Sequence, residues 1–274
     1  MARNLRPTRP APRSAPRSAP RTAWGWAWAG ALAGVLPAVV GFAPAHWLAG
    51  GVARATQGQV QLLQPRGTVW TGSAQLVLTG GQASKDSAAL PGRVDWQLRP
   101  TWGGLRARLQ AGCCTPQPLQ AQVHLRWAGP QITLADGQSQ WPAALLAGLG
   151  TPWNTLQPQG QLALQTRALA VQWAAGRMVL SGQAQLDARA MSSRLSTLRP
   201  MGSYRLVLQG GEVPTLALST LDGALQLSGS GQWVGNRLRF AGEASAAPER
   251  EAALSNLLNI IGRRNGARSI ITVG

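Results

Sequence analysis

Acidic residues and lysine are scarce in this chain. Its 274 residues include nine Asp and Glu and one lysine, Lys85, and the other basic residues are arginines that bring the formal net charge to +17. Such basicity favours an anionic partner: nucleic acid, anionic lipid or an acidic protein. Beyond the first 22 residues, however, the arginines mostly stand singly between apolar neighbours, which is typical of the solvated face of a strand. We therefore expect no nucleic-acid partner.

Side chains suited to catalysis are also rare. The two histidines, His46 and His124, lie far apart in the sequence, and the aspartates are scattered. Catalysis by side chains needs a nucleophile with a base, a carboxylate pair or metal ligands. No HExxH, CxxC, GxSxG or P-loop motif occurs. The sequence therefore predicts a protein that is not an enzyme, with no cofactor, no metal and no small-molecule substrate.

The only cysteines, Cys113 and Cys114, are adjacent. Neighbouring residues on a strand point to opposite faces, which favours one buried and one exposed thiol without a bridge. Two alternatives stay open: a redox-labile vicinal disulfide, whose geometry lies outside the usual range, and a bond to a cysteine of a partner. A disulfide framework is excluded.

No charged residue occurs between Arg21 and Arg54. Within this gap, residues 23–45 are mostly Ala, Gly, Trp, Leu and Val, and 23 helical residues would extend about 34 Å, enough to cross a bilayer core. Gly30 and Gly34 form a small-xxx-small pair that favours contact with another helix. We therefore expect a transmembrane helix over residues 23–45.

Six arginines precede this segment without any acid, so the positive-inside rule predicts a cytoplasmic N-terminus. Residues 1–22 repeat Ala, Pro, Arg and Ser, which indicates a disordered basic tail. Residues 46–274 would then form a periplasmic domain of a single-pass protein in the inner membrane. A signal peptide cleaved at Ala43-Pro44-Ala45 is the alternative.

The exported part alternates apolar and polar residues, as in half-buried antiparallel strands. Gly, Pro and Asn interrupt the alternation every 8–12 residues, which is typical of a meander. The alternating segments are Val60–Leu62, Ala74–Leu76, Val94–Leu98, Val123–Trp127, Leu162–Leu164, Val171–Trp173, Tyr204–Leu208 and Leu225–Leu227. The fold class is therefore mainly β, with a curved antiparallel sheet.

An internal repeat supports this sheet. Residues 172–184 match residues 232–244 at an offset of 60, and each copy reads as strand, tight turn and strand. Trp173 and Trp233 occupy equivalent places near the two turns, where we expect them on the buried face.

Two segments interrupt the β pattern. Residues 141–149 predict a short helix after Pro142. Residues 248–262 predict an amphipathic C-terminal helix, with Pro248 in its first turn and an apolar stripe at helical spacing. The stripe consists of Leu254, Leu257, Leu258 and Ile261. We expect the stripe to pack on the sheet, and the alternative is that it binds a partner.

Several segments resemble the type II secretion system protein N family. They follow the family's order over roughly residues 35–265, with Gly, Trp and Leu as the recurring types, whereas the Arg/Pro tail and Cys113-Cys114 depart from it. The segments are residues 42–48, 67–76, 90–100, 198–206, 223–233, 248–254 and 257–264. The resemblance implies an accessory inner-membrane component that helps to export folded proteins across the outer membrane through protein–protein contacts.

The expected partners are other type II secretion subunits and inner-membrane lipid. We take Gly30, Gly34, Trp70, Tyr204, Trp233 and Leu257, together with the edge strands of the sheet, as candidate contacts. An alternative function is lipid binding in an apolar β-trough, as in proteins that resemble the AsmA-like lipid-handling proteins. A lipid carrier needs its concave face apolar along its length, whereas a scaffold would have a filled core.

Overall fold

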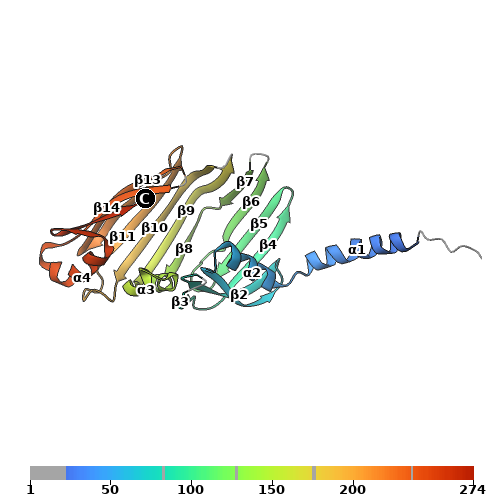
Figure 1. Ribbon diagram of the computed structural model, residues 1–274, viewed down its shortest axis with the longest axis horizontal. Helices are drawn as coiled ribbons and strands as arrows, with labels where there is room; N and C mark the ends of the chain where they lie inside the picture. Colours follow the sequence, from blue (N-terminus) through green and yellow to red (C-terminus); the bar gives the residue numbers. More distant parts are fainter. Residues whose placement is uncertain (1–22, 82–83, 127–128, 175–176, 236) are drawn as a thin grey trace, which may run out of the picture. The chain divides into compact units, whose positions relative to one another are not determined.

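A computed structural model describes residues 23–81, 84–126, 129–174, 177–235 and 237–274 (Figure 1). The basic tail predicted for residues 1–22 lies outside the described residues. The chain divides into two units, residues 1–42 and residues 43–274. Each unit is considered by itself.

The first unit contains helix α1 (Ala23–Gly41), which includes Pro37. The sequence predicts one helix over residues 23–45, whereas α1 ends at Gly41 and a second helix starts at Ala45. The reason is that Pro44 disfavours helical geometry at the preceding residue, Ala43. In the described part of the chain, no helix combines the length and hydropathy that crossing a membrane demands.

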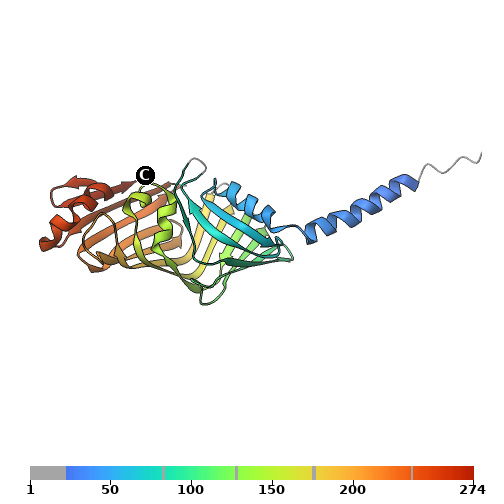
Figure 2. The ribbon, with the colours of Figure 1, turned by 90° about the horizontal axis from the view of Figure 1, so that it is seen from below.

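The second unit is built on one antiparallel sheet of sixteen strands, all within the described residues. Consecutive strands are mostly neighbours, so the chain meanders across the sheet (Figures 1 and 2). The first half contains β1 (Val60–Gly67), β2 (Thr71–Thr79), β3 (Ser87–Ala89), β4 (Val94–Thr101), β5 (Gly104–Ala111), β6 (Leu119–Arg126), β7 (Gly129–Leu134) and β8 (Gly137–Pro142).

The second half contains β9 (Gln159–Ala174), β10 (Arg177–Ser192), β11 (Gly202–Gly211), β12 (Thr215–Gly223), β13 (Leu225–Val234), β14 (Arg237–Ala246), β15 (Arg263–Asn265) and β16 (Arg268–Val273). Every alternating segment named above falls on a strand, except Trp127, which lies outside the described residues. Two of the segments, Leu162–Leu164 and Val171–Trp173, share the 16-residue strand β9. The mainly β, antiparallel prediction is therefore confirmed.

Strand β9 joins the two halves of the sheet. It pairs with β10 on one side and with β7 and β8 in succession on the other. Its pairing with β10 shifts register between Ser181 and Gln183. Gly182 has φ +81°, and a Cβ there would overlap the Ala168 carbonyl oxygen, so this bulge requires glycine.

The two ends of the strands differ. At one end, termed the tip end, short turns join β4 to β5, β6 to β7, β9 to β10, β11 to β12 and β13 to β14. At the other, termed the helix end, most connections are longer, although Ala224 alone separates β12 from β13. They carry η1 (Ala143–Leu149), α3 (Trp153–Leu156), η2 (Pro248–Arg250) and α4 (Glu251–Ile261), and α2 (Ala45–Ala55) leads into β1. In Figure 1 the tips lie at the top and these helices at the bottom.

Helices pack against one face of the sheet, termed the inner face. Near α2, Ala45 lies against Ala74 and Trp96. Near η1, Leu145 lies against Leu90 and Cys114. Near α4, a larger cluster contains Met191, Met201, Tyr204, Leu225, Ala244, Leu254, Leu257 and Leu258. The core therefore consists of three clusters along the helix end.

Both helical predictions after residue 140 are confirmed as segments. Residues 143–149 form the 3-10 helix η1, and residues 248–261 form η2 followed by α4. Leu254, Leu257 and Leu258 are at most 1% exposed, so the apolar stripe packs on the sheet.

The internal repeat corresponds to the hairpins β9–β10 and β13–β14. The turn residues predicted at Ala175, Gly176 and Asn236 lie outside the described residues. Trp173 pairs with Met178 and is 41% exposed, so its predicted burial is wrong. Trp233 is half-buried. The cause is the location of these residues near the tip end, which no helix covers.

Candidate functional site

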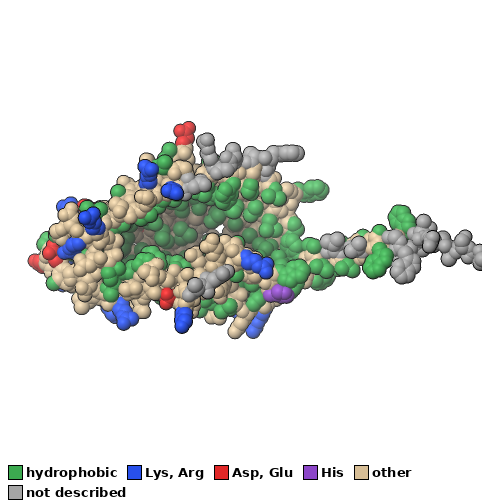
Figure 3. All heavy atoms as spheres, in the orientation of Figure 1, with side chains coloured by type: hydrophobic (Ala, Val, Ile, Leu, Met, Phe, Trp, Pro, Cys, Tyr) green, Lys and Arg blue, Asp and Glu red, His purple; other side chains and the backbone are tan. Residues whose placement is uncertain are grey.

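An apolar hollow lies on the inner face between the sheet and helices α3 and α4. Its volume is about 270 Å³. The sheet contributes residues of β9 to β13, and the helices contribute Leu146, Trp153, Leu156, Leu257 and Ile261. Figure 3 shows this side of the sheet as a depression lined by hydrophobic side chains.

Strand register explains why the lining is apolar. Ala188 pairs with Tyr204, and Leu206 pairs with both Leu186 and Leu218, so these side chains share one face. Because strand side chains alternate between faces, the intervening polar residues point away from the hollow. The alternation in the sequence thus positions a continuous apolar floor of leucines across five strands, β9 to β13.

Tyr204 is the only tyrosine in the chain and lines the hollow. Tyr204 is 7% exposed, and its Oη has no hydrogen-bond partner in the described structure. Burial raises the pKa of the Tyr204 hydroxyl above its ordinary value, and the negative charge of Asp222 raises it further. The hydroxyl therefore stays neutral well above pH 10.

Directly opposite, the outer face carries a buried ion pair. Asp187 is 2% exposed, and Arg205 donates to both of its carboxylate oxygens, from Nε at 2.8 Å and from Nη2 at 2.9 Å. These hydrogen bonds lower the pKa of Asp187, opposed by desolvation, with smaller lowering contributions from Gln185 and Arg189. The carboxylate is thus ionised, and it braces β10 against β11 beneath the hollow.

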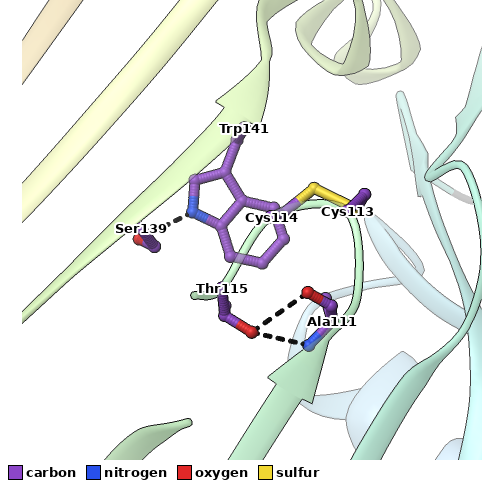
Figure 4. Close-up of a disulfide and its surroundings, with 6 residues drawn as sticks. All are labelled: Ala111, Cys113, Cys114, Thr115, Ser139 and Trp141. Atoms are coloured by element: carbon purple, nitrogen blue, oxygen red, sulfur yellow. Dashed lines mark hydrogen bonds between the residues drawn. A yellow bond between two sulfur atoms is a disulfide. The ribbon is translucent and has the colours of Figure 1, made fainter. Parts of the chain in front are cut away.

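Cys113 and Cys114 form a disulfide in the connection between β5 and β6 (Figure 4). The favoured prediction of two unbridged thiols is therefore wrong, although Cys113 is exposed and Cys114 is buried as expected. The turn is closed by Thr115, whose Oγ1 accepts a hydrogen bond from the Ala111 N–H at 2.8 Å. This hydrogen bond brings the two neighbouring cysteines into one tight turn, which strand geometry would not have done.

The Trp141 ring packs beside this turn. Its Nε1 donates to the Ser139 Oγ at 2.9 Å, and the cluster around Leu90 and Leu145 encloses Cys114. The disulfide is thus anchored at the helix end through its buried half. In the described part of the chain, no group of three His, Cys, Asp or Glu side chains could hold a metal ion.

The structure brings two of the predicted contact residues together. Tyr204 and Leu257 both line the hollow. Trp233 lies further along β13 towards the tip end, and Trp70 lies in the connection between β1 and β2, where its carbonyl accepts a hydrogen bond from Leu98. Gly30 and Gly34 lie on α1, and a Cβ at either position would meet no atom within 4 Å. Their roles as partner contacts stay predictions.

The sequence offered an apolar trough as an alternative, but it did not predict where the hollow lies or which residues line it. The alternation of β9 to β13 indicated which residues share a face, but the positions of α3 and the Met191–Met201 connection were not predicted. One signal in the sequence could have indicated the hollow. Leucines recur at alternate positions in five successive strands, and the helices contain fewer apolar residues than would be needed to cover them all.

Comparison with known proteins gives one finding. A family model described as type II secretion system (T2SS), protein N, matches residues 58–271. No curated protein and no solved structure matches the chain. The matched range includes α3, α4 and every strand of the sheet except the last two residues of β16. The chain therefore belongs to the type II secretion system protein N family.

Proposed function

We propose that this protein is an accessory inner-membrane component of the type II secretion system, acting through contacts with other subunits. The family match carries the proposal, because it spans residues 58–271 and so nearly the whole second unit. Membership supports a role in type II secretion. The inner-membrane location and the contacts are the finer steps that we propose.

The location rests on the first 54 residues and on the disulfide. Six arginines precede a segment without charge, which favours a cytoplasmic N-terminus and a membrane anchor at α1. A disulfide persists in an oxidising compartment such as the periplasm, and Cys113–Cys114 lies in the second unit. Reporter fusions before residue 23 and after residue 274, combined with membrane fractionation, test this topology.

Three surfaces are available for partners. The Gly30/Gly34 face of α1 allows close helix contact. The sheet ends in two edge strands, β1 and β15, which each pair on one side only. Strand β15 is only three residues long and carries two arginines, which discourages strand addition. In β1 the features of this kind, Pro65, Arg66 and a register shift, are confined to the second half, so residues 60–63 are the edge that we propose for contact.

The test is deletion of the gene in the native bacterium, together with crosslinking in living cells. A photoreactive residue at Trp70 reports on the β1 side, and one at Leu221, which is 44% exposed at the helix end, is the control. We expect secreted proteins to accumulate in the periplasm of the deletion strain, and adducts to other secretion subunits from position 70. Normal secretion without such adducts would contradict the proposal.

The hollow favours a second candidate function, binding of an acyl chain. An apolar cavity of about 150 Å³ accommodates benzene, so about 270 Å³ would hold roughly ten carbon atoms. A helix about 10 Å wide would not fit, and an extended peptide would leave most of its backbone groups unpaired against the apolar lining. The substitution Ala188→Trp would fill the hollow, and Ala217→Trp on the outer face is its matched control.

Lipid extraction and mass spectrometry of the purified full chain would detect the ligand. We expect lipid to co-purify with the native protein and with A217W but not with A188W. Equal lipid content in all three proteins would show that the hollow is not the binding site.

A further inference from the structure

The tip end of the sheet exposes large apolar side chains in a row. Trp102, in the β4–β5 turn, is 104% exposed, and Leu125, at the end of β6, is 72% exposed. The Leu125 N–H donates to the Gly103 carbonyl at 2.8 Å, so these two tips are in contact. Trp173 and Met178 continue the row on β9–β10.

Arginines accompany this row without acids. Arg99 and Arg106 are paired across β4 and β5, and Arg108 follows two residues later on the same face. Residues 97–109, 120–134 and 170–180, which contain these three tips, include no Asp or Glu. Within the described residues, no ion pair neutralises Arg99, Arg106 or Arg108.

Like charges directly opposite each other on a sheet are destabilising, so an unneutralised arginine pair calls for an anionic partner. Trp favours the interface between headgroups and acyl chains, and an arginine near a membrane surface is attracted by anionic lipid. Successive hairpins stand about 10 Å apart. Such separate apolar points suit a deformable lipid surface better than a packed protein interface, which would need a central enclosed patch.

We propose that the described residues at the tip end of β4, β5 and β6 dock on an anionic phospholipid bilayer, with Trp102 and Leu125 at headgroup level and Arg99 and Arg106 against the phosphates. This contact is distinct from α1 and from the hollow, and it does not depend on the secretion role. Without the six arginines of the tail, 20 basic and nine acidic residues give the second unit a formal net charge of +11, which supports attraction to such a surface.

The β11–β12 tip provides an internal contrast. The β11–β12 turn carries Glu212 beside Val213, so an anionic surface would repel one of its charges. The β11–β12 tip is therefore not part of the proposed docking surface.

The experiment uses the full chain reconstituted into vesicles. The exposed Thr101, next to Trp102, is replaced by cysteine and labelled with a polarity-sensitive fluorophore, since Cys113 and Cys114 are already bonded to each other. The control label is at Leu221→Cys, exposed at the helix end. Vesicles contain either phosphatidylcholine alone or phosphatidylcholine with a quarter phosphatidylglycerol.

We expect a blue shift of the label at 101, and its quenching by spin-labelled lipid, only in the anionic vesicles. The label at 221 should not respond. The double variant Arg99→Gln/Arg106→Gln should weaken the response roughly 25-fold, because each arginine near the surface contributes about fivefold. Salt at 0.5 M should have a similar effect because it screens these charges.

Trp102→Ala provides a second test, because the side chain is fully exposed and its removal should leave the fold intact. We expect this variant to show a smaller blue shift of the label at 101 in the anionic vesicles. The fold of each variant is checked by circular dichroism. Equal responses at 101 and 221, or a response that is independent of vesicle charge, would overturn the proposal. So would a response at 101 that arises only when other secretion subunits are added, since the tips would then bind protein.

Discussion

The two ends of the strands treat large apolar side chains in opposite ways. At the helix end, Leu90, Leu225 and Leu254 are at most 2% exposed beneath helices and connections, whereas at the tip end Trp102 is fully exposed. Both ends belong to the same strands and have the same alternation. The alternating pattern therefore defines the apolar face of the sheet, and the connections between strands determine which part of that face is buried.

Two tryptophans of one hairpin test this contrast most strongly. Trp96 is 2% exposed between Ala45 and Ala74, and its Nε1 donates to the carbonyls of Thr68 and Val69. We expect Trp96→Ala to lower the free energy of unfolding by about 3–5 kcal/mol. Trp102→Ala should change it by less than about 0.5 kcal/mol. Urea denaturation measures both, and equal losses would show that the tip is covered in solution.

The same contrast exists within helix α4. Leu257 is 1% exposed in the largest cluster, whereas Ile260 is 45% exposed. Leu257→Ala should cost about 2–5 kcal/mol, and Ile260→Ala should cost much less. Thermal unfolding followed by circular dichroism compares the two variants. A similar loss in both would mean that α4 contacts another surface through Ile260.

The ion pair on the outer face should make stability depend on acid. The pKa of Asp187 is lower in the folded chain than in the unfolded chain, so its contribution is present above about pH 4 and is lost as the pH falls. Asp187→Asn should cost about 1–3 kcal/mol at pH 7 and flatten this acid dependence. Unfolding curves between pH 3 and pH 7 test it, and an unchanged slope would contradict the role of Asp187.

Tyr204 should show the smallest effect and the clearest signal. Because its pKa is raised in the folded state, the folded chain keeps the proton longer, so stability falls as the pH rises above about 10. As the only tyrosine, it alone produces tyrosinate absorbance at 295 nm. We expect ionisation near pH 10 only in denaturant, and Tyr204→Phe should remove the alkaline loss with little cost at pH 7.

Much of the fold could be predicted from local pattern. The strand positions and the buried stripe of Leu254, Leu257 and Leu258 followed from periodicity, because side-chain direction repeats with the backbone. The family was likewise recognisable from the order of its Gly, Trp and Leu segments, and the family model confirms it.

The rest depended on contacts between distant residues. Burial of Trp173 was predicted from alternation, but it requires a covering element that the tip end lacks. The Cys113–Cys114 bridge requires a turn closed by Thr115, which a strand-based interpretation does not include. The hollow requires α3 and α4 to stand apart over the leucines, and no local pattern sets that separation.

The near-sequential strand order has a consequence for how the protein folds. Almost every strand pairs with one that precedes it closely in the sequence, and only β15 and β16 are placed in reverse order at the end. Short sequence separations between contacts lower the entropy cost of each closure and favour rapid folding. The sheet could therefore assemble hairpin by hairpin while the chain is still being delivered, so that α4 closes over strands that are already in place and β15 and β16 complete the sheet last.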